Sequence, residues 1–518
     1  MSSFRVILIV AVLALPSCSC ANILAIVPMP SYIHQIAFTS LWKELSLRGH
    51  KVTVVTTDPQ NDPKLTNLTE IDTNWSYKYF GNVSKLVEKS MNMWNAFDVF
   101  SGIMTGIGEG QLSFGPVQKL MQREEHFDVL LVEGFFPEFL GFAEIYNCPK
   151  ILITSLDAPK FIHRFFGNPT HPILNPEMVT SFHGNLNFRE RVISTIFDVY
   201  FAFHSVKNYY AEKQKILNKY FNTKLTIFEL MSDVDLLFVN VDPVLQTVKS
   251  LGPSTVTIGG FRKDTRKRYL PKDVQDFLDS AKEGFIYFSL GSNVKSKDLR
   301  KETLEAIIDT LKSLPYKILW KFEADELPGK PDNVKLIKWS PQQSVLAHPN
   351  IILFVTQGGL QSMEEAIYSE VPLVVIPFFG DQEQNAKLMQ SKGIAVIVEV
   401  RPYLDKDKLK TAMLEVITNP QYRNTVRRLK QLALDTPMTG LEKAVWWTEY
   451  VIRNKGAKHL RNPAADIPLY QYYLIDVISF LLAVVALVIT AVVLLVKFVY
   501  RFISKFLGKQ VPVHKKVN

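Results

Sequence analysis

The stretch that decides the fold is WSPQQSVLAHPNIILFVTQGGLQSMEEAIYSEVPLVVIPFFGDQEQN, residues 339–385. Its apolar run IILFVT (351–356) is typical of a buried strand and leads through the turn QGG (357–359) into a helical pattern. A strand, a glycine turn and a helix start bring unpaired backbone N–H groups and the positive end of a helix dipole to one point, where a phosphate can bind. Many α/β proteins use such a turn only to reverse the chain, so the turn alone leaves both alternatives open.

The strand–helix pattern of this stretch recurs on both sides of it. Short β-branched runs alternate with helical stretches, as in a parallel sheet covered by helices on both faces. The runs form two series: 22–27, 51–57, 127–132, 150–154 and 235–240, then 284–292, 316–322, 334–338, 351–356 and 371–377. A polar, charged segment separates the two series. We therefore predict two doubly wound domains at 22–261 and 283–455, a linker at 262–282, and a ligand site in the cleft between the domains.

The first 21 residues are typical of a cleaved signal peptide. They carry one positive charge, Arg5, followed by an apolar run from 6 to 15, then Pro16 and small residues. A first membrane helix is the alternative, but ten apolar residues are too short for about 30 Å of hydrocarbon. We therefore expect residues 1–21 to direct translocation of the chain.

A second apolar run, 477–496, is interrupted only by Ser479 and Thr490. Twenty residues at about 1.5 Å each span about 30 Å, which predicts a transmembrane helix rather than a buried core helix. The tail 497–518 carries six Lys or Arg residues and no acidic residue, which places it in the cytosol. It ends in KKVN, which is similar to the dilysine signal that returns membrane proteins to the endoplasmic reticulum. We expect a single-pass protein of that membrane with a lumenal body.

Three features are not expected from the sequence: nucleic-acid binding, an internal disulfide and a metal site. Without the six tail charges and Arg5, 52 basic residues stand against 50 acidic ones, a balance that does not indicate nucleic-acid binding. Cys18 and Cys20 fall in the predicted signal peptide, so Cys148 remains alone and no internal disulfide is expected. No cluster of His, Cys, Asp and Glu has the spacing of a metal site, so we expect no metal.

Three N-glycosylation sequons lie at Asn67, Asn74 and Asn82, within one short polar stretch. In a lumenal body they predict an exposed loop and a glycoprotein.

The whole stretch 339–385 closely resembles the donor-binding signature of the UDP-glycosyltransferases. That family includes the UDP-glucuronosyltransferases and the invertebrate UDP-glucosyltransferases. VPMPSYIHQ (27–35), FDVLLVEGFF (127–136) and the turn GSN (291–293) are also similar to family motifs. The resemblance covers essentially the full chain. It implies the α/β GT-B fold, in which two Rossmann-like doubly wound domains are followed here by a C-terminal transmembrane helix.

The resemblance also implies how the donor is bound. Trp339 would stack on the uracil ring, Gln342 would hydrogen-bond the base edge, and Glu365 would accept hydrogen bonds from the ribose hydroxyls. Asp381 and Gln382 would bind hydroxyls of the transferred sugar. The complete implied donor-binding set is Ser292, Asn293, Trp339, Gln342, Gln357, Gly358, Gly359, Gln361, Glu365, Asp381 and Gln382.

By the same resemblance, His34 is the catalytic base that takes the proton of the acceptor hydroxyl. Taken alone, a histidine near a helix start is usually structural. Glu133 stands where the family has the aspartate that orients this histidine, and its longer side chain would shift the helix start or weaken the contact. Gln357 replaces the histidine of the vertebrate THGG sequence, so it keeps an amide donor but carries no charge. Similar TQGG sequences occur among invertebrate and baculoviral members.

We therefore expect an inverting transfer of a hexose, glucose in our interpretation, from a UDP-sugar to a hydroxyl of a small lipophilic acceptor. Phenolics and xenobiotics are the expected acceptors, with steroids left open, which corresponds to a role in detoxification. The UDP-sugar is a co-substrate, so no cofactor is expected, and a homo-oligomer is compatible with these observations. The aromatics that would suit an acceptor pocket, and equally a core, are Trp94, Phe135, Phe136, Phe165 and Phe166.

Two alternatives remain open. The donor could be UDP-glucuronate, whose carboxylate calls for a cation, and Arg262 is a candidate. The chain could also be a non-catalytic lipophile-binding membrane protein of the same fold.

Overall fold

The computed structural model describes residues 20–80, 94–177, 180, 182–260, 269–292, 294–378, 381–401 and 403–507. The chain divides into two compact units, Met1–Asn462 and Pro463–Asn518. Several predicted features lie outside the described residues: the signal peptide up to residue 19, Asn82, Arg262, Asn293 and the dilysine end.

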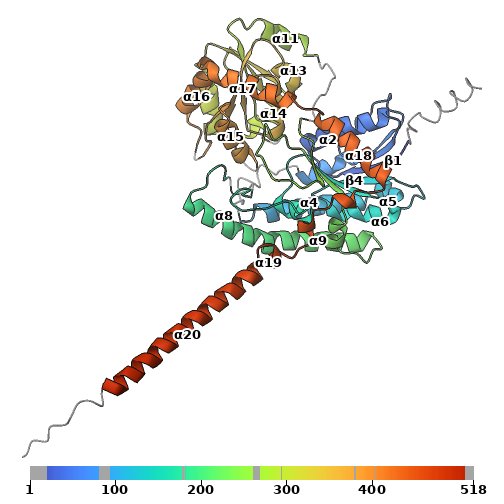
Figure 1. Cartoon of the computed structure of the whole chain (residues 1–518). Helices are drawn as coiled ribbons and strands as arrows, with labels where there is room; N and C mark the ends of the chain where they lie inside the picture. Colours follow the sequence, from blue (N-terminus) through green and yellow to red (C-terminus); the bar gives the residue numbers. More distant parts are fainter. Residues whose placement is uncertain are drawn as a thin grey trace, which may run out of the picture. The chain divides into compact units, whose positions relative to one another are not determined.

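The first unit contains two lobes, each built on a parallel sheet (Figure 1). The sheet of the first lobe has the strand order β3-β2-β1-β4-β5-β6-β7. Its strands are β1 (Asn22–Val27), β2 (Lys51–Thr56), β3 (Leu68–Asp72), β4 (Val129–Glu133), β5 (Lys150–Thr154), β6 (Leu236–Val239) and β7 (Thr255–Thr257). Ile23 lies beside Val52 on one side and beside Val129 on the other. The strand order reverses between β1 and β4, which is where open α/β sheets bind ligands.

The sheet of the second lobe has the order β10-β9-β8-β11-β12-β13 and reverses between β8 and β11. Its strands are β8 (Phe285–Ser289), β9 (Lys317–Lys321), β10 (Val334–Ile337), β11 (Ile351–Thr356), β12 (Leu373–Val375) and β13 (Ala395–Ile397). The register pairs Thr356 with Ser289, so the ends of the two central strands lie side by side. The predicted pair of doubly wound domains is therefore confirmed.

Helices cover both faces of each sheet (Figure 1). The first lobe has α2 (Tyr32–Leu47), η1 (Asn74–Phe80), α4 (Ala96–Leu112), α5 (Gly115–Met121), η2 (Pro137–Leu140), α6 (Gly141–Tyr146), α7 (Lys160–Phe165), α8 (Phe188–Tyr200), the π-helix η4 (Phe201–Ser205), α9 (Val206–Tyr220) and α10 (Ile227–Ser232). The second lobe has α11 (Lys272–Asp279), η5 (Ser296–Asp298), α12 (Lys301–Lys312), α13 (Gln342–Leu346), α14 (Leu360–Tyr368), α15 (Gln382–Ser391), α16 (Lys406–Thr418) and α17 (Pro420–Leu434). Then follow α18 (Gly440–Asn454), η6 (Lys458–Leu460), η7 (Pro463–Ala465), α19 (Leu469–Tyr472) and α20 (Ile475–Leu507).

Alternate residues of the strands fill separate cores. Leu24 and Ile26 of β1 pack on one face of the first sheet, whereas Ile23 and Ala25 pack on the other face, beneath α2. Because both faces are covered, these strands read as unbroken apolar runs, which is why the sequence showed them clearly.

Helix α18 follows the second lobe in the chain but packs on the first lobe. Its Ala444, Val445 and Val451 belong to the same core as Ile23. Trp447 is partly buried against that core, while the neighbouring Trp446 is exposed. The chain therefore crosses between the lobes twice.

Helix α11 occupies part of the predicted linker 262–282. Its Val274 and Leu278, four residues apart, are buried in the core of the second lobe. The second lobe therefore begins earlier in the chain than the sequence suggested. The sequence did not reveal this helix because only one narrow face of it is apolar.

The predicted sequon loop is not a single loop. Asn67 is exposed and immediately precedes β3, which pairs with β2. Asn74 begins η1, where its Nδ2 donates to Thr57 O at 2.9 Å. Both asparagines are on the surface, but regular structure lies between them.

The second unit contains α20, a 33-residue helix that is long and apolar enough to cross a membrane. It includes the predicted span 477–496 and continues through the basic residues Lys497, Arg501 and Lys505.

Replacing Gly440, the first residue of α18, tests how closely that helix must approach the first lobe. A Cβ atom there would lie 2.2 Å from Ile258 O, so Gly440→Ala must push α18 off the sheet. We expect a loss of about 1–3 kcal/mol, seen as a lower thermal midpoint of the detergent-solubilised protein. Gly102→Ala in α4 is the control, because nothing lies within 4 Å of a Cβ there. Equal midpoints for the two variants would contradict the close approach.

Candidate active site

The turn between β1 and α2 places His34 at the carboxyl end of the first sheet. Gln35 holds this turn, since its Nε2 donates to Val27 O (2.8 Å) and Met29 O (2.7 Å) while its Oε1 accepts from Thr56 Oγ1 (2.7 Å). Gln35 is buried, whereas the His34 side chain keeps 16% of its surface exposed. The start of α2 is therefore held by hydrogen bonds from inside the lobe, and the imidazole remains accessible.

Glu133 ends β4, the strand next to β1, and its side chain is fully buried. Its Oε1 lies 2.9 Å from His34 Nδ1, and its Oε2 accepts from Met29 N at 3.0 Å. The longer side chain thus reaches the histidine at an ordinary hydrogen-bond distance. Because a carboxylate accepts hydrogen bonds, the neutral ring carries its proton on Nδ1 and presents the Nε2 lone pair.

Ser155 is a residue of this site that the sequence did not indicate. It directly follows β5, and its Oγ lies 2.6 Å from His34 Nδ1. Its own O accepts from Asn240 Nδ2 at 2.9 Å, which fixes the backbone. A serine after a strand is commonplace, and only the β4–β5 adjacency brings this one to the histidine.

In the second lobe, the turn after β11 meets the turn after β8. Gln357 is buried, and its Oε1 accepts from Thr356 Oγ1 at 3.0 Å. Gly291 has φ +76°, a conformation that favours glycine, and a Cβ there would lie 2.2 Å from Gln357 Nε2, so the two turns lie in close contact. Gly358 has φ +91°, a conformation that favours glycine, and Gly359 then caps α14. The predicted phosphate loops are therefore brought together, with the backbone N–H groups of a helix start beside them.

Two of the residues implied for uridine, Gln342 and Glu365, are hydrogen-bonded to each other. Gln342 Nε2 donates to Glu365 Oε2 (2.7 Å), and Gln343 Nε2 donates to Glu365 Oε1 (3.1 Å). Trp339 is 54% exposed, with Lys321 Nζ 5.5 Å from its ring centre. An exposed indole suits a flat base, and a carboxylate can accept hydrogen bonds from the hydroxyls of a ribose.

Two contacts join the lobes at this position. Gln361 Nε2 donates to Ile33 O at 2.5 Å, one residue before His34. The ring of Tyr32 lies edge-on to Trp339, with the ring centres 5.7 Å apart. Gln361 Oε1 is buried and has no hydrogen-bond partner within the described residues.

The start of α15 faces the same cleft. Asp381 accepts from Asn385 Nδ2 at 2.6 Å, and Gln382 Oε1 accepts from Phe378 N at 2.9 Å. Burial raises the pKa of Asp381 above its ordinary value, and the Asn385 hydrogen bond and the charge of His34 oppose that rise. Asn385 Nδ2 also donates to Gly358 O at 3.1 Å, which joins the start of α15 to the turn after β11. Ser292 also lies in the described part of the site, after Gly291.

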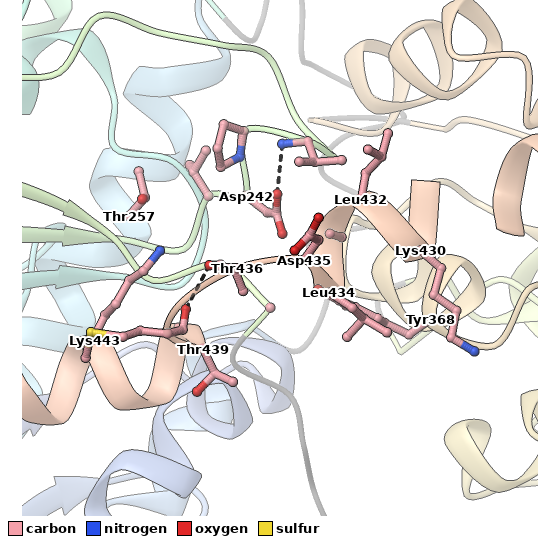
Figure 2. Close-up of a pocket in the computed structure, with 18 of the residues that line it drawn as sticks. Asp242, Thr257, Tyr368, Lys430, Leu432, Leu434, Asp435, Thr436, Thr439 and Lys443 are labelled. Atoms are coloured by element: carbon pink, nitrogen blue, oxygen red, sulfur yellow. Dashed lines mark hydrogen bonds between the residues drawn. The ribbon is translucent and has the colours of Figure 1, made fainter. Parts of the chain in front are cut away.

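A separate hollow of about 510 Å³ is lined by Tyr368 and by residues from the segments 241–260 and 430–443 (Figure 2). Asp242, Lys430 and Lys443 are among its lining residues, and Thr436 Oγ1 donates to Met438 O there at 3.1 Å. None of the predicted site residues lines it. Within the described residues, no group of three or more His, Cys, Asp and Glu could hold a metal ion.

A family model described as UDP-glucoronosyl and UDP-glucosyl transferase matches residues 22–510. The chain belongs to the UDP-glycosyltransferase family. As a UDP-glycosyltransferase it is similar to UDP-glucosyltransferase 2 of Dactylopius coccus, with 34% identity over 89% of this chain and 90% of that protein. UDP-glucuronosyltransferase 2B33 of Macaca mulatta is 31% identical, with 91% of each chain covered.

Solved structures support the fold. The glycotransferase of kitacinnamycin superposes with a TM-score of 0.57 at 20% identity, covering 85% of this chain and 100% of that chain. Os79 from O. sativa, in complex with U2F and trichothecene, gives a TM-score of 0.57 at 16% identity, covering 83% and 100%. The GT-B arrangement predicted for this UDP-glycosyltransferase is confirmed.

Ser155→Ala tests the hydroxyl beside His34 in this UDP-glycosyltransferase. Losing one hydrogen bond of about 1 kcal/mol should lower kcat roughly 5-fold and leave KM for the UDP-sugar unchanged. Ser254→Ala is the matched control, because the Ser254 hydroxyl is also buried but has no hydrogen-bond partner within the described residues. If both variants turn over at the wild-type rate, Ser155 has no part in orienting the imidazole.

Proposed function

We propose that the chain is an active, inverting glycosyltransferase in which His34 is the general base. The observation that carries the proposal is the 2.9 Å contact between His34 Nδ1 and the buried Glu133 carboxylate. It leaves Nε2 available to an acceptor hydroxyl and puts a negative charge behind the ring, where positive charge develops during proton transfer.

The proposed reaction is a single displacement. The acceptor oxygen attacks the anomeric carbon, a new C–O bond forms, and the bond from that carbon to the diphosphate oxygen breaks. The acceptor proton goes to His34 Nε2, and UDP leaves with the bonding electron pair. Because attack and departure occur on opposite faces, an α-linked donor gives a β-glycoside. The turns at Gly291 and Gly358 support the role of the second lobe in holding the diphosphate.

Glucose is the donor sugar we propose, with a phenolic or other lipophilic hydroxyl compound as acceptor. The support is the similarity to a protein named UDP-glucosyltransferase 2 and to one named Ecdysteroid UDP-glucosyltransferase, which is 30% identical. No metal is proposed for the reaction.

UDP-glucuronate remains the second candidate donor because of one observation. Arg401 Nη2 donates to Phe378 O at 3.3 Å, and Phe378 N donates to Gln382 Oε1. A guanidinium therefore lies close to the residues implied for the sugar, where it could meet a carboxylate. Arg401 is exposed, so its charge is also well solvated there.

Three of the five aromatics that the sequence suggested for an acceptor pocket pack within the first lobe. Phe136 and Phe166 are buried in the core of the first lobe, and Phe165 packs against Tyr210 and Phe228. These rings are packing residues, so we propose the acceptor class from the family relationship and not from a pocket.

We further propose that α20 anchors the protein in the endoplasmic reticulum membrane with the first unit in the lumen. The support is the apolar helix and the basic residues at its end. Protease added to sealed microsomes should then leave the first unit intact until detergent is added. Digestion without detergent would contradict this orientation.

His34→Ala should lower transfer roughly 100-fold or more while UDP binding is retained, because general-base catalysis is typically worth 10² to 10⁴. Glu133→Gln should lower it by less, since the amide still reaches Nδ1 but cannot balance the imidazolium charge. His126→Ala is the control, because His126 is exposed and precedes β4, at the other end of the sheet. Unchanged turnover of His34→Ala would remove this residue from its role.

A donor panel decides between the candidate sugars. Microsomal enzyme with UDP-glucose, UDP-glucuronate, UDP-galactose and UDP-N-acetylglucosamine should transfer glucose fastest to a mixed set of phenols and steroids, with or without EDTA. If glucuronate is preferred, Arg401→Met should abolish that preference. Transfer from none of the four donors would favour the non-catalytic alternative.

A further inference from the structure

A lysine and a glutamate form an ion pair in the interior of the first lobe. Lys213 of α9 and Glu138 of η2 have no exposed side-chain surface, and Lys213 Nζ lies 2.9 Å from Glu138 Oε1. Lys213 Nζ also donates to Met104 O of α4 at 3.3 Å and lies 5.1 Å from the centre of the Phe136 ring. Apolar side chains in place of such a pair are often neutral or stabilising. The pair is therefore poor evidence for a purely stabilising role.

The carboxyl group of Glu138 is closely enclosed. A Cβ on Gly108 of α4 would lie 2.0 Å from Glu138 Oε1, so the backbone of α4 lies directly against this group. Glu138 Oε2 is buried and has no hydrogen-bond partner within the described residues. Burial raises the pKa of Glu138 and lowers that of Lys213, and the charge of each residue opposes the shift of the other. Among the described residues, Lys213 supplies the only side-chain hydrogen bond to this carboxyl group.

The turn that leads from Glu133 to Glu138 joins β4 to η2. Glu133 is the last residue of β4, so the sheet holds it from one side only. Inside the turn, Phe136 N donates to Glu133 O at 2.9 Å. Tyr209 Oη of α9 donates to Phe135 O at 2.8 Å. The part of the chain that directly follows the Glu133 carboxylate is therefore held from α9.

Two residues of α9 hold this turn from the same direction. Tyr209 and Lys213 are four residues apart, which places them on one face of the helix. Tyr209 holds the backbone of Phe135, and Lys213 holds the side chain of Glu138. Both side chains are buried, so water does not compete for these contacts. The end of β4 is thus fixed by the sheet on one side and by α9 on the other.

We propose that Tyr209 and Lys213 are positioning residues for the pair of Glu133 and His34. By holding the turn after β4, they keep the Glu133 carboxylate at hydrogen-bond distance from His34 Nδ1. The proposal rests on the general-base role of His34 given above. If the turn moves, the carboxylate stabilises the imidazolium less, and proton transfer from the acceptor becomes slower. Donor binding should not change, because the residues implied for the UDP-sugar belong to the second lobe.

Tyr209→Phe and Tyr210→Phe form a matched pair for the test. The two tyrosines are buried neighbours on α9, but within the described residues only the Tyr209 hydroxyl has a hydrogen-bond partner. We expect Tyr209→Phe to lower kcat roughly 5-fold, the loss of about one hydrogen bond, and to leave KM for the preferred UDP-sugar unchanged. Tyr210→Phe should leave both constants at the wild-type values.

The pH profile of kcat/KM separates positioning from general loosening of the lobe. A histidine farther from its carboxylate holds a proton less tightly, so the acid limb of the profile should move to lower pH by about 0.5 unit in Tyr209→Phe. A loss of folded protein would lower the whole profile without moving its limbs. Tyr210→Phe should keep the wild-type profile.

The ion pair is tested with both charges removed together. Lys213→Met alone would leave Glu138 buried without its partner, whereas Lys213→Met with Glu138→Met replaces the pair by unbranched side chains of similar length. We expect this double variant to keep a thermal midpoint close to that of the wild type, to lose kcat at least 5-fold and to show the same shift of the acid limb. If the double variant does not fold, Tyr209→Phe decides.

His34→Ala in the same assays separates the two proposals. If His34→Ala is impaired while Tyr209→Phe and the folded double variant show the wild-type kcat and pH profile, the positioning role is overturned and the general base remains. If His34→Ala transfers at the wild-type rate, the general-base role itself fails.

Discussion

A carboxylate without exposed surface needs internal partners, and the site of this protein is arranged around the one at Glu133. Removing a charge from water costs several kcal/mol unless hydrogen bonds replace the lost solvation. Here Met29 N and His34 Nδ1 supply those bonds, both from the connection between β1 and α2. The same connection is held by Gln35 from inside the lobe. The position of the histidine is therefore a consequence of satisfying a buried charge between two neighbouring strands.

The second lobe brings its own strand ends to the same cleft. Two of the contacts that cross between the lobes there, Gln361 to Ile33 O and Tyr32 against Trp339, involve the residues directly before His34 in the sequence. A nucleotide stacked on Trp339 would meet Tyr32 as well. A nucleotide bound in this way would be linked to the helix start that carries the imidazole, through contacts one and two residues away from it.

Much of this arrangement could be predicted from the sequence, and the reasons are specific. The run 351–356 matches β11 residue for residue, because a strand buried on both faces is uniformly apolar. The edge strands β3, β7 and β13 were missed, since they are short or, like LTEID, mix charged and apolar residues without a regular period. His34 and Glu133 were identified through family motifs rather than through any local pattern. Ser155 could not be identified, because its significance depends on which strands lie side by side.

The return of α18 to the first lobe has a consequence for how the molecule can move. In the sequence, the second lobe is inserted between two segments that both belong to the first lobe. The chain then continues from the first lobe toward α20. The apolar helix α20 is therefore joined in sequence to the lobe that carries His34 and not to the lobe that carries Trp339. A pull on α20 would therefore reach the lobe that carries Trp339 only through the lobe that carries His34.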